Sequence, residues 1–239
     1  MEIFYVPRID GDKVVLEPGE SLHAVKVLRL RERDSVMVTD GRGNLGEGSI
    51  IHAHPKKCSI HIDKIQRSSR RSHYTLHMAI APVKNSERTD WFLEKATEIG
   101  IDAFTPLICR FSERNKVNHS RLEKIAVSAI KQSQSVWLPV IHPEVPFAEF
   151  IRQPFEGDAF IAHCHQTPKP HLKEVVLPCR PILVLIGPEG DFSPEEVEMA
   201  KAAGFTEISL GNSRLRTETA ALVACHTIAL INHESITSI

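Results

Sequence analysis

The apolar and polar positions between residues 181 and 231 predict two strands, each followed by a helix. Residues 181–186 are continuously apolar and rich in β-branched side chains, as in a strand that is buried on both faces. A second short strand is expected at residues 206–210. A helix that is apolar nearly all round is expected at about residues 220–231, and such a helix needs packing partners on more than one side.

The helix between these two strands has clear signals at both of its ends. Ser193-Pro-Glu-Glu196 combines an N-cap serine, a proline at the first helical position and a glutamate three residues after the cap. Gly204 is a typical C-terminal stop. The first strand leads into the polar loop 187–191 and the second into the polar loop 211–219. Ligands of open α/β sheets bind at the carboxyl ends of the strands, so we expect both loops at a ligand site.

Residues 1–68 have a different pattern, with many short strands and a single helix. Residues 59–63 alternate apolar and polar positions, which predicts one buried and one solvated face. Asp10-Gly11 and Asp40-Gly41 are turn signals. We therefore expect a small β-barrel with one helix at about residues 21–28. Its strands are expected at residues 2–9, 13–17, 35–40, 45–53 and 58–65.

From about residue 74 onward, strands and helices alternate. The polar segment 66–72 is a plausible linker, so we place the domain boundary near residue 70, with domains 1–71 and 72–239. Repeated strand–helix units imply an α/β fold with a mainly parallel sheet. The expected strands are 74–83, 103–108 and 158–163, and the expected helices are 86–99 and 120–134, the second with a Ser120…Glu123 capping box.

Composition and charge are those of an ordinary globular protein. Hydrophobic residues make up 42% and charged residues 25% of the 239 residues, and the net charge is −1. Residues 1–71 hold 13 Lys+Arg against 10 Asp+Glu, and the remainder holds 16 against 20. Five scattered cysteines without C-x-x-C spacing argue against a disulfide framework or zinc knuckle. With neither a signal segment nor a membrane-spanning run, we expect a soluble, cytoplasmic protein without membrane association.

The glycine motifs of the common nucleotide-binding folds are absent. Neither G-x-G-x-x-G in a first strand–helix turn nor G-x-x-x-x-G-K-[ST] occurs, which argues against NAD and ATP. Taken alone, Gly187 and Gly190 are either simple turn residues or part of a ligand loop.

Several motifs resemble the SPOUT methyltransferases, and specifically the family that methylates N3 of a uridine in 16S (small-subunit) ribosomal RNA. The resemblance covers nearly the whole chain. It rests on Leu185-Ile-Gly-Pro-Glu-Gly190, Leu210-Gly211, Leu215-Arg-Thr-Glu-Thr-Ala220, His23-Ala-Val-Lys-Val-Leu-Arg29, Glu94-Lys-Ala-Thr-Glu-Ile-Gly100 and Gln132-Ser-Gln-Ser135. The chain departs from the family pattern at Asp191, where Gly is usual, and at Ser213-Arg214, where Arg-Ile is usual.

The resemblance implies a fold and a cofactor. Residues 1–71 would form a PUA-like RNA-binding β-barrel, and residues 72–239 a SPOUT α/β domain. In that domain the loop 211–219 would thread through the first loop and form a deep trefoil knot, a feature that local sequence pattern cannot predict. The cofactor would be S-adenosyl-L-methionine. The implied cofactor-binding residues are Leu185, Gly187, Pro188, Glu189, Gly190, Leu210, Gly211, Leu215, Arg216 and Thr219.

The chemistry implied is methyl transfer from a sulfonium to a ring nitrogen, for which alignment is the main requirement. Uridine N3 must lose its proton, and a positive group near the base oxygens would stabilise the resulting anion. We expect Arg216 to supply that charge and Glu218 to position the base or accept the proton. The alternative is an Arg216–Glu218 ion pair that only holds the loop. Glu189 is expected either to form hydrogen bonds in the loop or across a dimer, or to contact the substrate.

Basic residues in the first domain are candidates for RNA contact. His23, Lys26 and Arg29, with Arg31 and Arg33, fall within eleven residues, and Arg8 is nearby. Lys84, before the helix 86–99, is a further candidate. The alternative for each of them is plain solvated surface.

The remaining expectations concern metals and partners. His163-Cys-His165 either borders the adenosine pocket or, less plausibly with only one thiolate, binds a metal, and we expect no metal. The resemblance and the apolar C-terminal helix favour a homodimer that acts on small-subunit ribosomal RNA, with the assembled subunit as the expected substrate. The competing hypotheses are a ribose 2′-O-methyltransferase of the same superfamily and a non-catalytic RNA-binding or ribosome-assembly factor.

Overall fold

The structure, a computed structural model, describes residues 1–68 and 73–236, with side chains to residue 233. The chain forms two compact units, one of Met1–Arg71 with Val127–Leu138 and one of Ser72–Ala126 with Pro139–Ile239. The short segment 127–138, which the sequence pattern assigns to the second domain, therefore clusters with the first unit. Most of the predicted linker 66–72 lies outside the described residues.

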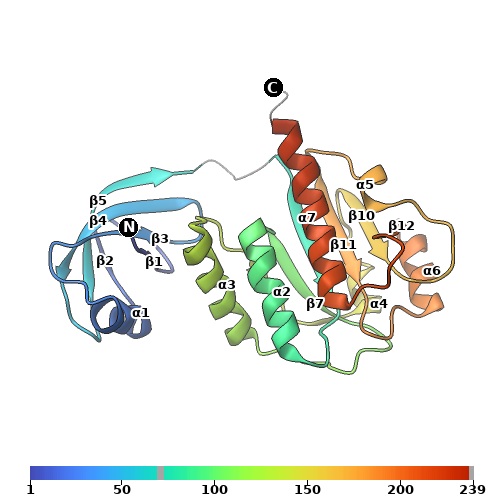
Figure 1. The fold of residues 1–239 in the computed structure, drawn as a ribbon, viewed down its shortest axis with the longest axis horizontal. Helices are drawn as coiled ribbons and strands as arrows, with labels where there is room; N and C mark the ends of the chain where they lie inside the picture. The colour runs from blue at the N-terminus through green and yellow to red at the C-terminus, as the bar shows by residue number, and fades with distance from the viewer. Residues whose placement is uncertain (69–72, 237–239) are drawn as a thin grey trace. The chain divides into compact units, whose positions relative to one another are not determined.

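The first unit contains a mixed five-stranded sheet that forms a half-barrel (Figure 1). The strand order is β1-β3-β4-β5-β2, with β1 parallel to β3 and the other pairs antiparallel. The strands are β1 (Ile3–Tyr5), β2 (Lys13–Val15), β3 (Ser35–Thr39), β4 (Asn44–His52) and β5 (Ser59–Arg67). Their inward residues, among them Phe4, Val36 and Ile60, form one buried core.

The helical segment of this unit begins earlier than the apolar pattern predicts. α1 (Pro18–Leu22) starts with Pro18 in its first turn, a position that proline favours, and is followed by a π-helical turn, η1 (His23–Val27). Ser21 is buried within this segment, where its hydroxyl donates to the Leu16 carbonyl at 3.0 Å and accepts from the Cys58 amide at 2.9 Å. The predicted strand 2–9 shrinks to the three residues of β1.

The second unit is built on a parallel sheet, which confirms the expected α/β class. The strand order is β12-β10-β11-β6-β7-β8, and β9 also pairs with β7. The strands are β6 (Thr75–Ile80), β7 (Ala103–Ile108), β8 (Val140–Ile141), β9 (Val145–Pro146), β10 (Asp158–Ala162), β11 (Pro181–Ile186) and β12 (Thr206–Ile208). Because all pairs are parallel, the carboxyl ends of these strands lie at one edge of the sheet.

Helices cover both faces of this sheet and enclose two apolar cores (Figure 1). One core packs the sheet against α2, α7 and α5, and includes Phe92, Ala224 and Leu172. The other packs it against α4 and α6, and includes Phe150 and Val197. The helices are α2 (Ser86–Ile99), α3 (His119–Ser133), α4 (Phe147–Phe150), α5 (Leu172–Val175), α6 (Pro194–Ala202) and α7 (Thr217–Ile236).

Two helix starts differ from the sequence prediction. α7 begins at Thr217 instead of about residue 220, so Glu218 lies in its first turn and not in a loop. α3 begins at His119, and the Asn118 side chain accepts a hydrogen bond from the Arg121 amide at 3.1 Å. The predicted Ser120 cap is wrong because Asn118, an equally good capping residue, precedes it.

Candidate functional site

Four loops meet at the carboxyl edge of the parallel sheet, after the neighbouring strands β12, β10, β11 and β6. The sequence singled out two of them, 187–191 and 211–219. A hydrogen bond from the Lys84 amide to Glu189 joins the loop after β6 to the loop after β11. The Asp191 carboxylate joins the β11 loop to the β10 loop through the Cys164 amide. Backbone hydrogen bonds of Ser209 with Pro170 and Leu172 join the β10 loop to the β12 loop. The four loops therefore form one contiguous surface.

The first loop makes a tight turn that depends on glycine. A Cβ atom at Gly187 would lie 3.1 Å from the ring and the backbone nitrogen of Phe192, and one at Gly190 would lie 3.0 Å from the Cβ of Phe111. Gly187 and Pro188 are buried, whereas Gly190 is exposed. Leu185 is fully buried in the core on the α4 and α6 side of the sheet, so its side chain packs the fold instead of facing a ligand.

Glu189 holds the first loop to its neighbour. Its Oε1 atom accepts the hydrogen bond from the Lys84 amide at 2.9 Å. The Lys84 ammonium in turn pairs with Glu113 at 2.8 Å, and this hydrogen bond raises the pKa of Lys84. Lys84 therefore belongs to the sheet edge of the second unit, whereas the other four predicted RNA-binding residues belong to the first unit.

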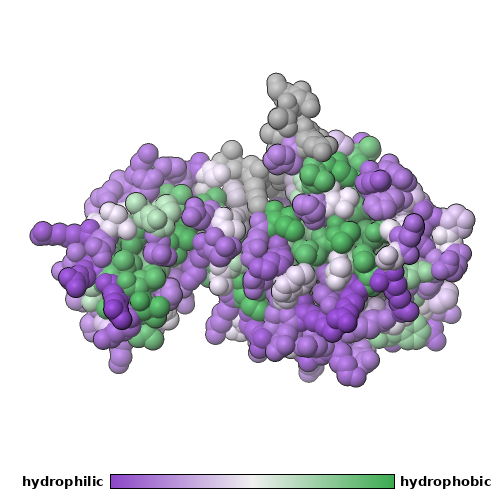
Figure 2. Space-filling view, in the orientation of Figure 1, coloured by the Kyte–Doolittle hydropathy of each residue, from purple (hydrophilic) through white to green (hydrophobic). Residues whose placement is uncertain are grey.

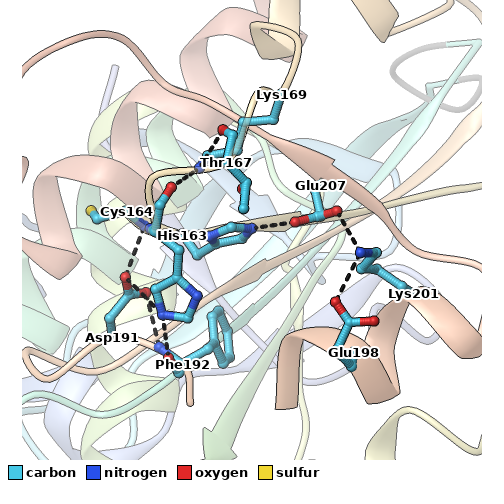
Figure 3. A network of polar contacts seen from close by, with 10 residues as sticks. His163, Cys164, Thr167, Lys169, Asp191, Phe192, Glu198, Lys201 and Glu207 are labelled. Atoms are coloured by element: carbon cyan, nitrogen blue, oxygen red, sulfur yellow. Dashed lines mark hydrogen bonds and ion pairs between the residues drawn. The ribbon is translucent and has the colours of Figure 1, made fainter. Parts of the chain in front are cut away.

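Asp191 occupies a position where glycine is usual in the family that the sequence resembles. Its backbone φ is 68°, a left-handed conformation that glycine adopts freely and other residues adopt at a cost. Its carboxylate accepts hydrogen bonds from the backbone amides of Cys164 and Phe192, both at 2.8 Å (Figure 3). The aspartate thus keeps the turn that glycine would make and adds a link to the loop after β10.

His163 lies at the end of β10 with a fully buried side chain, in a chain of polar contacts (Figure 3). Its Nδ1 atom accepts from the His165 amide, so Nε2 carries the proton and donates to Glu207 at 3.0 Å. Glu207 also pairs with Lys201 at 3.1 Å. Burial lowers the pKa of His163, and the nearby Lys169 charge lowers it further, against the raising effect of Glu207. The ring is therefore a neutral hydrogen-bond donor that fixes the loop.

The second loop carries most of the remaining predicted residues. Gly211 is exposed and has a φ of 124°, which requires glycine. Leu210 and Leu215 are half-buried, and Leu210 packs against the main core. Arg216 is exposed, and its carbonyl accepts from the Ala220 amide at 2.8 Å where α7 begins. Thr219 is half-buried in the first turn of α7.

Glu218 is buried and has a partner that the sequence did not indicate. Its Oε1 atom lies 3.5 Å from Nη1 of Arg88, which extends from the first turn of α2. Arg216 and Glu218 both lie in the described part of the chain, and they form no ion pair with each other. The alternative hypothesis of an Arg216–Glu218 ion pair is therefore wrong. Nothing in the local pattern of residues 86–99 distinguished Arg88, because its role depends on the packing of α2 against α7.

The predicted basic residues of the first unit are on its surface. His23 and Lys26 lie on η1, and Arg29 follows with a left-handed φ of 57°; all three are exposed. A shallow hollow of about 580 Å³ is lined by Arg29 and Arg31 together with Val25, Leu30, Glu32 and Ala53. Arg8 pairs with Asp10 at 2.6 Å. The exposure of these residues fits RNA contact and equally fits solvated surface.

The described residues contain neither a group of three or more His, Cys, Asp or Glu able to hold a metal ion nor a helix long and apolar enough to cross a membrane. His163 and His165 bond to Glu207 and to the Phe192 carbonyl instead.

Comparison with known proteins identifies the family. A model described as an RNA methyltransferase domain matches residues 70–229, and one described as an RNA methyltransferase PUA domain matches residues 16–63. The chain belongs to the RNA methyltransferase family. The resemblance drawn from the loops 187–191 and 211–219 is thereby confirmed, and so is a PUA domain at the N-terminal end.

Several members of this RNA methyltransferase family are similar over nearly their whole length. Ribosomal RNA small subunit methyltransferase E of Rickettsia conorii is 27% identical over 93% of this chain and 91% of its own. A crystal structure of a probable rRNA-methyltransferase from Porphyromonas gingivalis is 38% identical, with a TM-score of 0.92 over 98% of this chain and all of that one. Ribosomal RNA small subunit methyltransferase E of Neisseria gonorrhoeae, bound to S-adenosyl methionine, is 25% identical, with a TM-score of 0.87 over 97% of this chain and 98% of that one.

Proposed function

We propose that this protein transfers the methyl group of S-adenosyl-L-methionine to N3 of a uridine in small-subunit ribosomal RNA. One observation carries the proposal: the loop 187–191 and the segment 211–219, which carries Arg216 and the buried Glu218, share one edge of the sheet. They do so in a chain that is similar to small-subunit methyltransferases over nearly its whole length.

The residues of the two loops fit the proposed cofactor. Gly190 is exposed and leaves main-chain polar groups open to a ligand, whereas the N–H and carbonyl of Gly211 both bond to the Ser209 hydroxyl, which fixes the start of the second loop. The half-buried Leu210 and Leu215 offer apolar surface for an adenine ring. S-adenosylmethionine supplies an activated methyl group when it is bound. The loop residues 187–190, 210–211, 215–216 and 219 would hold it, with Leu185 contributing only its main chain.

Arg216 and Glu218 are the proposed catalytic pair. Arg216 is exposed and free of ion pairs within the described chain, so its charge is available to the oxygens of a uracil that loses its N3 proton. Glu218 would position the base or accept that proton, and Arg88 holds its carboxylate. Glu189 would hold the shape of the first loop, since its Oε1 atom accepts a hydrogen bond from the Lys84 amide.

The surface of the first unit is the proposed grip on RNA. Arg8, Lys26 and Arg29 are exposed cations that can contact phosphates, and the exposed ring of His23 can donate a hydrogen bond to one. Lys84 would contribute from the second unit. N3 lies on the Watson–Crick edge of uracil, so the target base must be unpaired or flipped out when it reacts. The proposed substrate is the assembled small subunit in the cytoplasm.

The knot and the homodimer are part of the same proposal. Threading of residues 211–219 through the first loop rests on the family resemblance.

The dimer is supported by apolar surface on α7 and α2, where Leu230 is 50% and Trp91 43% exposed. Figure 2 shows apolar side chains gathered over α7. Sedimentation should detect a dimer at micromolar concentration, and a fully active species of about the 26.8 kDa chain mass would remove the dimer from the mechanism.

The direct test uses purified protein, S-adenosylmethionine with an isotopically labelled methyl group, and small ribosomal subunits from cells lacking the gene. Mass spectrometry of the digested nucleosides should find the label in N3-methyluridine. Label in a 2′-O-methylated nucleoside would favour the ribose methyltransferase, and no transfer at all would favour a non-catalytic assembly factor.

A further inference from the structure

The N-terminal half of α2 and the loop between β7 and α3 (residues 109–118) enclose a cavity of about 210 Å³ that the proposed cofactor loops do not line. Pro82, Val117 and Leu122 form apolar parts of its wall, and Asp90, Arg114 and Arg121 form charged parts. All of these residues belong to the second unit. A small cavity with apolar walls and a few convergent polar groups is the usual form of a ligand site.

Arg114 is a charged group of this cavity that has no partner among the described residues. Asp90 is buried and pairs with Arg121 at 2.6 Å, so these two charges neutralise each other. Arg114 is half-buried on the cavity wall and has no ion pair or side-chain hydrogen bond to any residue that the structure describes. A guanidinium carries five hydrogen-bond donors in a planar fork, and a partly desolvated one needs acceptors. A ligand of this cavity is therefore expected to present acceptor atoms to Arg114.

The mixture of lining groups favours a nucleobase over a phosphate. The Asp90 carboxylate, although paired with Arg121, has further acceptor sites for the amino or imino group of a base. Arg114 can donate to a ring carbonyl or ring nitrogen, and the apolar wall can contact the base face. Unpaired RNA bases are recognised through this combination of stacking and edge hydrogen bonds.

The position of the cavity indicates which base it takes. Ser86 and Asp90 line the cavity, whereas Arg88, which holds Glu218, lies between them in sequence. Residues two apart on an α-helix point about 200° apart, so the cavity and Glu218 lie on opposite sides of α2. The base bound here is thus a neighbour of the methylated base and not the methylated base itself.

The loop that carries Arg114 also reaches the cofactor edge. Phe111, three residues before Arg114, is 47% exposed and packs directly against Gly190 of the first loop. An RNA strand that runs along the loop 109–118, from Gly190 to the cavity, would meet the exposed ring of Phe111. Such rings stack on unpaired bases.

We propose that this cavity binds an unpaired base adjacent to the target uridine, and that Arg114 is a specificity-determining residue for the RNA. This inference rests on the proposed function, because it takes the substrate to be RNA.

The test uses full-length Arg114→Ala, Arg114→Lys and, as a matched control, Arg152→Ala, which removes an exposed arginine elsewhere in the same unit. The probe is a single-stranded RNA oligonucleotide centred on the methylated uridine, together with copies in which one neighbouring position is abasic. We expect Arg114→Ala to weaken binding about 5- to 150-fold, as for the loss of one specific base contact. Arg114→Lys should be nearly as weak because the planar fork is lost. One abasic position should weaken the wild type and leave Arg114→Ala unaffected.

The salt dependence of binding separates a base contact from a phosphate contact. Removal of one phosphate contact on a single strand reduces the salt slope by about 0.7, whereas removal of a base contact leaves it unchanged. Full rescue by Arg114→Lys, together with a salt slope that is reduced in Arg114→Ala, would replace the base pocket by a phosphate site. Unchanged RNA binding by Arg114→Ala would overturn the inference. Methylation by the wild-type protein, measured in parallel on small subunits, reports separately on the proposed function.

Discussion

Glu218 shows how a single side chain is placed by two distant elements. The first turn of α7 carries it, and Arg88 of α2 meets its carboxylate at 3.5 Å. The side chain is only 10% exposed, so water does not replace this partner. The geometry favours a carboxylate held in one orientation, which is what positioning a base or accepting a proton requires.

Glu218→Gln keeps the shape of this side chain and removes its basicity. We expect turnover to fall about 10²- to 10⁴-fold, the usual contribution of a proton acceptor, while S-adenosylmethionine affinity in calorimetry stays unchanged. Glu156→Gln, an exposed glutamate of the same unit, is the control. If the variant loses activity only in proportion to its loss of folded protein, as measured by unfolding, Glu218 is a structural residue.

The buried His77 of β6 should make the free energy of unfolding depend on pH. Burial, with a smaller effect of His142, lowers its pKa from 6.5 to about 4. Since the unfolded chain binds the proton first, the stabilisation is complete above pH 6.5 and is lost as the pH falls towards 4. The difference corresponds to at most about 3 kcal/mol. Denaturant unfolding at pH 7 and pH 4.5 should show the loss, and His77→Gln should reduce it. An equal acid response of both proteins would contradict this assignment.

At the scale of elements, the sequence pattern predicts most helices and strands but not the contacts between them. The bounds of α2, β7 and β11 match the prediction because capping signals and continuous apolar runs are local. α7 begins at Thr217, inside a polar stretch that reads as a loop, and Arg88 and the cavity beside α2 depend on packing that no local pattern records. The deep burial of Leu185, in contrast, agrees with the continuous apolar run 181–186, which predicts a strand that is buried on both faces.

The loop 187–191 offers a test of backbone against side chain. Asp191→Ala loses the two carboxylate hydrogen bonds and keeps the cost of a left-handed backbone, whereas Asp191→Gly loses the bonds and relieves that cost. We expect the alanine variant to be less stable than the glycine variant by about 1 kcal/mol. Thermal unfolding measures the difference, and equal melting temperatures would mean that φ at this position is not constrained.

At the scale of the whole molecule, the two units carry separate parts of the proposed function. The parallel sheet of the second unit gathers the cofactor loops, and the first unit presents exposed cations. The division could be anticipated from the change of pattern near residue 70, but the clustering of Val127–Leu138 with the first unit could not. Deleting residues 1–71 would therefore separate them from a segment with which they pack, and point variants are the better probe.

Lys26→Ala combined with Arg29→Ala tests the RNA grip in the full chain. For every phosphate that the variant no longer binds, the salt slope of RNA binding should fall by about 0.7–0.9 and the affinity should weaken, with S-adenosylmethionine affinity unchanged. Filter binding over a salt series gives the slope. Lys56→Ala with Lys57→Ala removes two exposed lysines of the same unit and serves as the control. Equal salt slopes for wild type and variant would mean that residues 23–33 are solvated surface that does not contact RNA.

The central claim is that this chain methylates uridine N3 in small-subunit ribosomal RNA through Arg216 and Glu218. The most direct measurement is mass spectrometry of nucleosides from small-subunit ribosomal RNA of cells with the gene, without it, and with the Glu218→Gln gene in its place. The account predicts abundant N3-methyluridine in the first cells only, with none in the second and a strongly reduced level in the third. Loss of a 2′-O-methylated nucleoside in its place, or N3-methyluridine that persists without the gene, would contradict it.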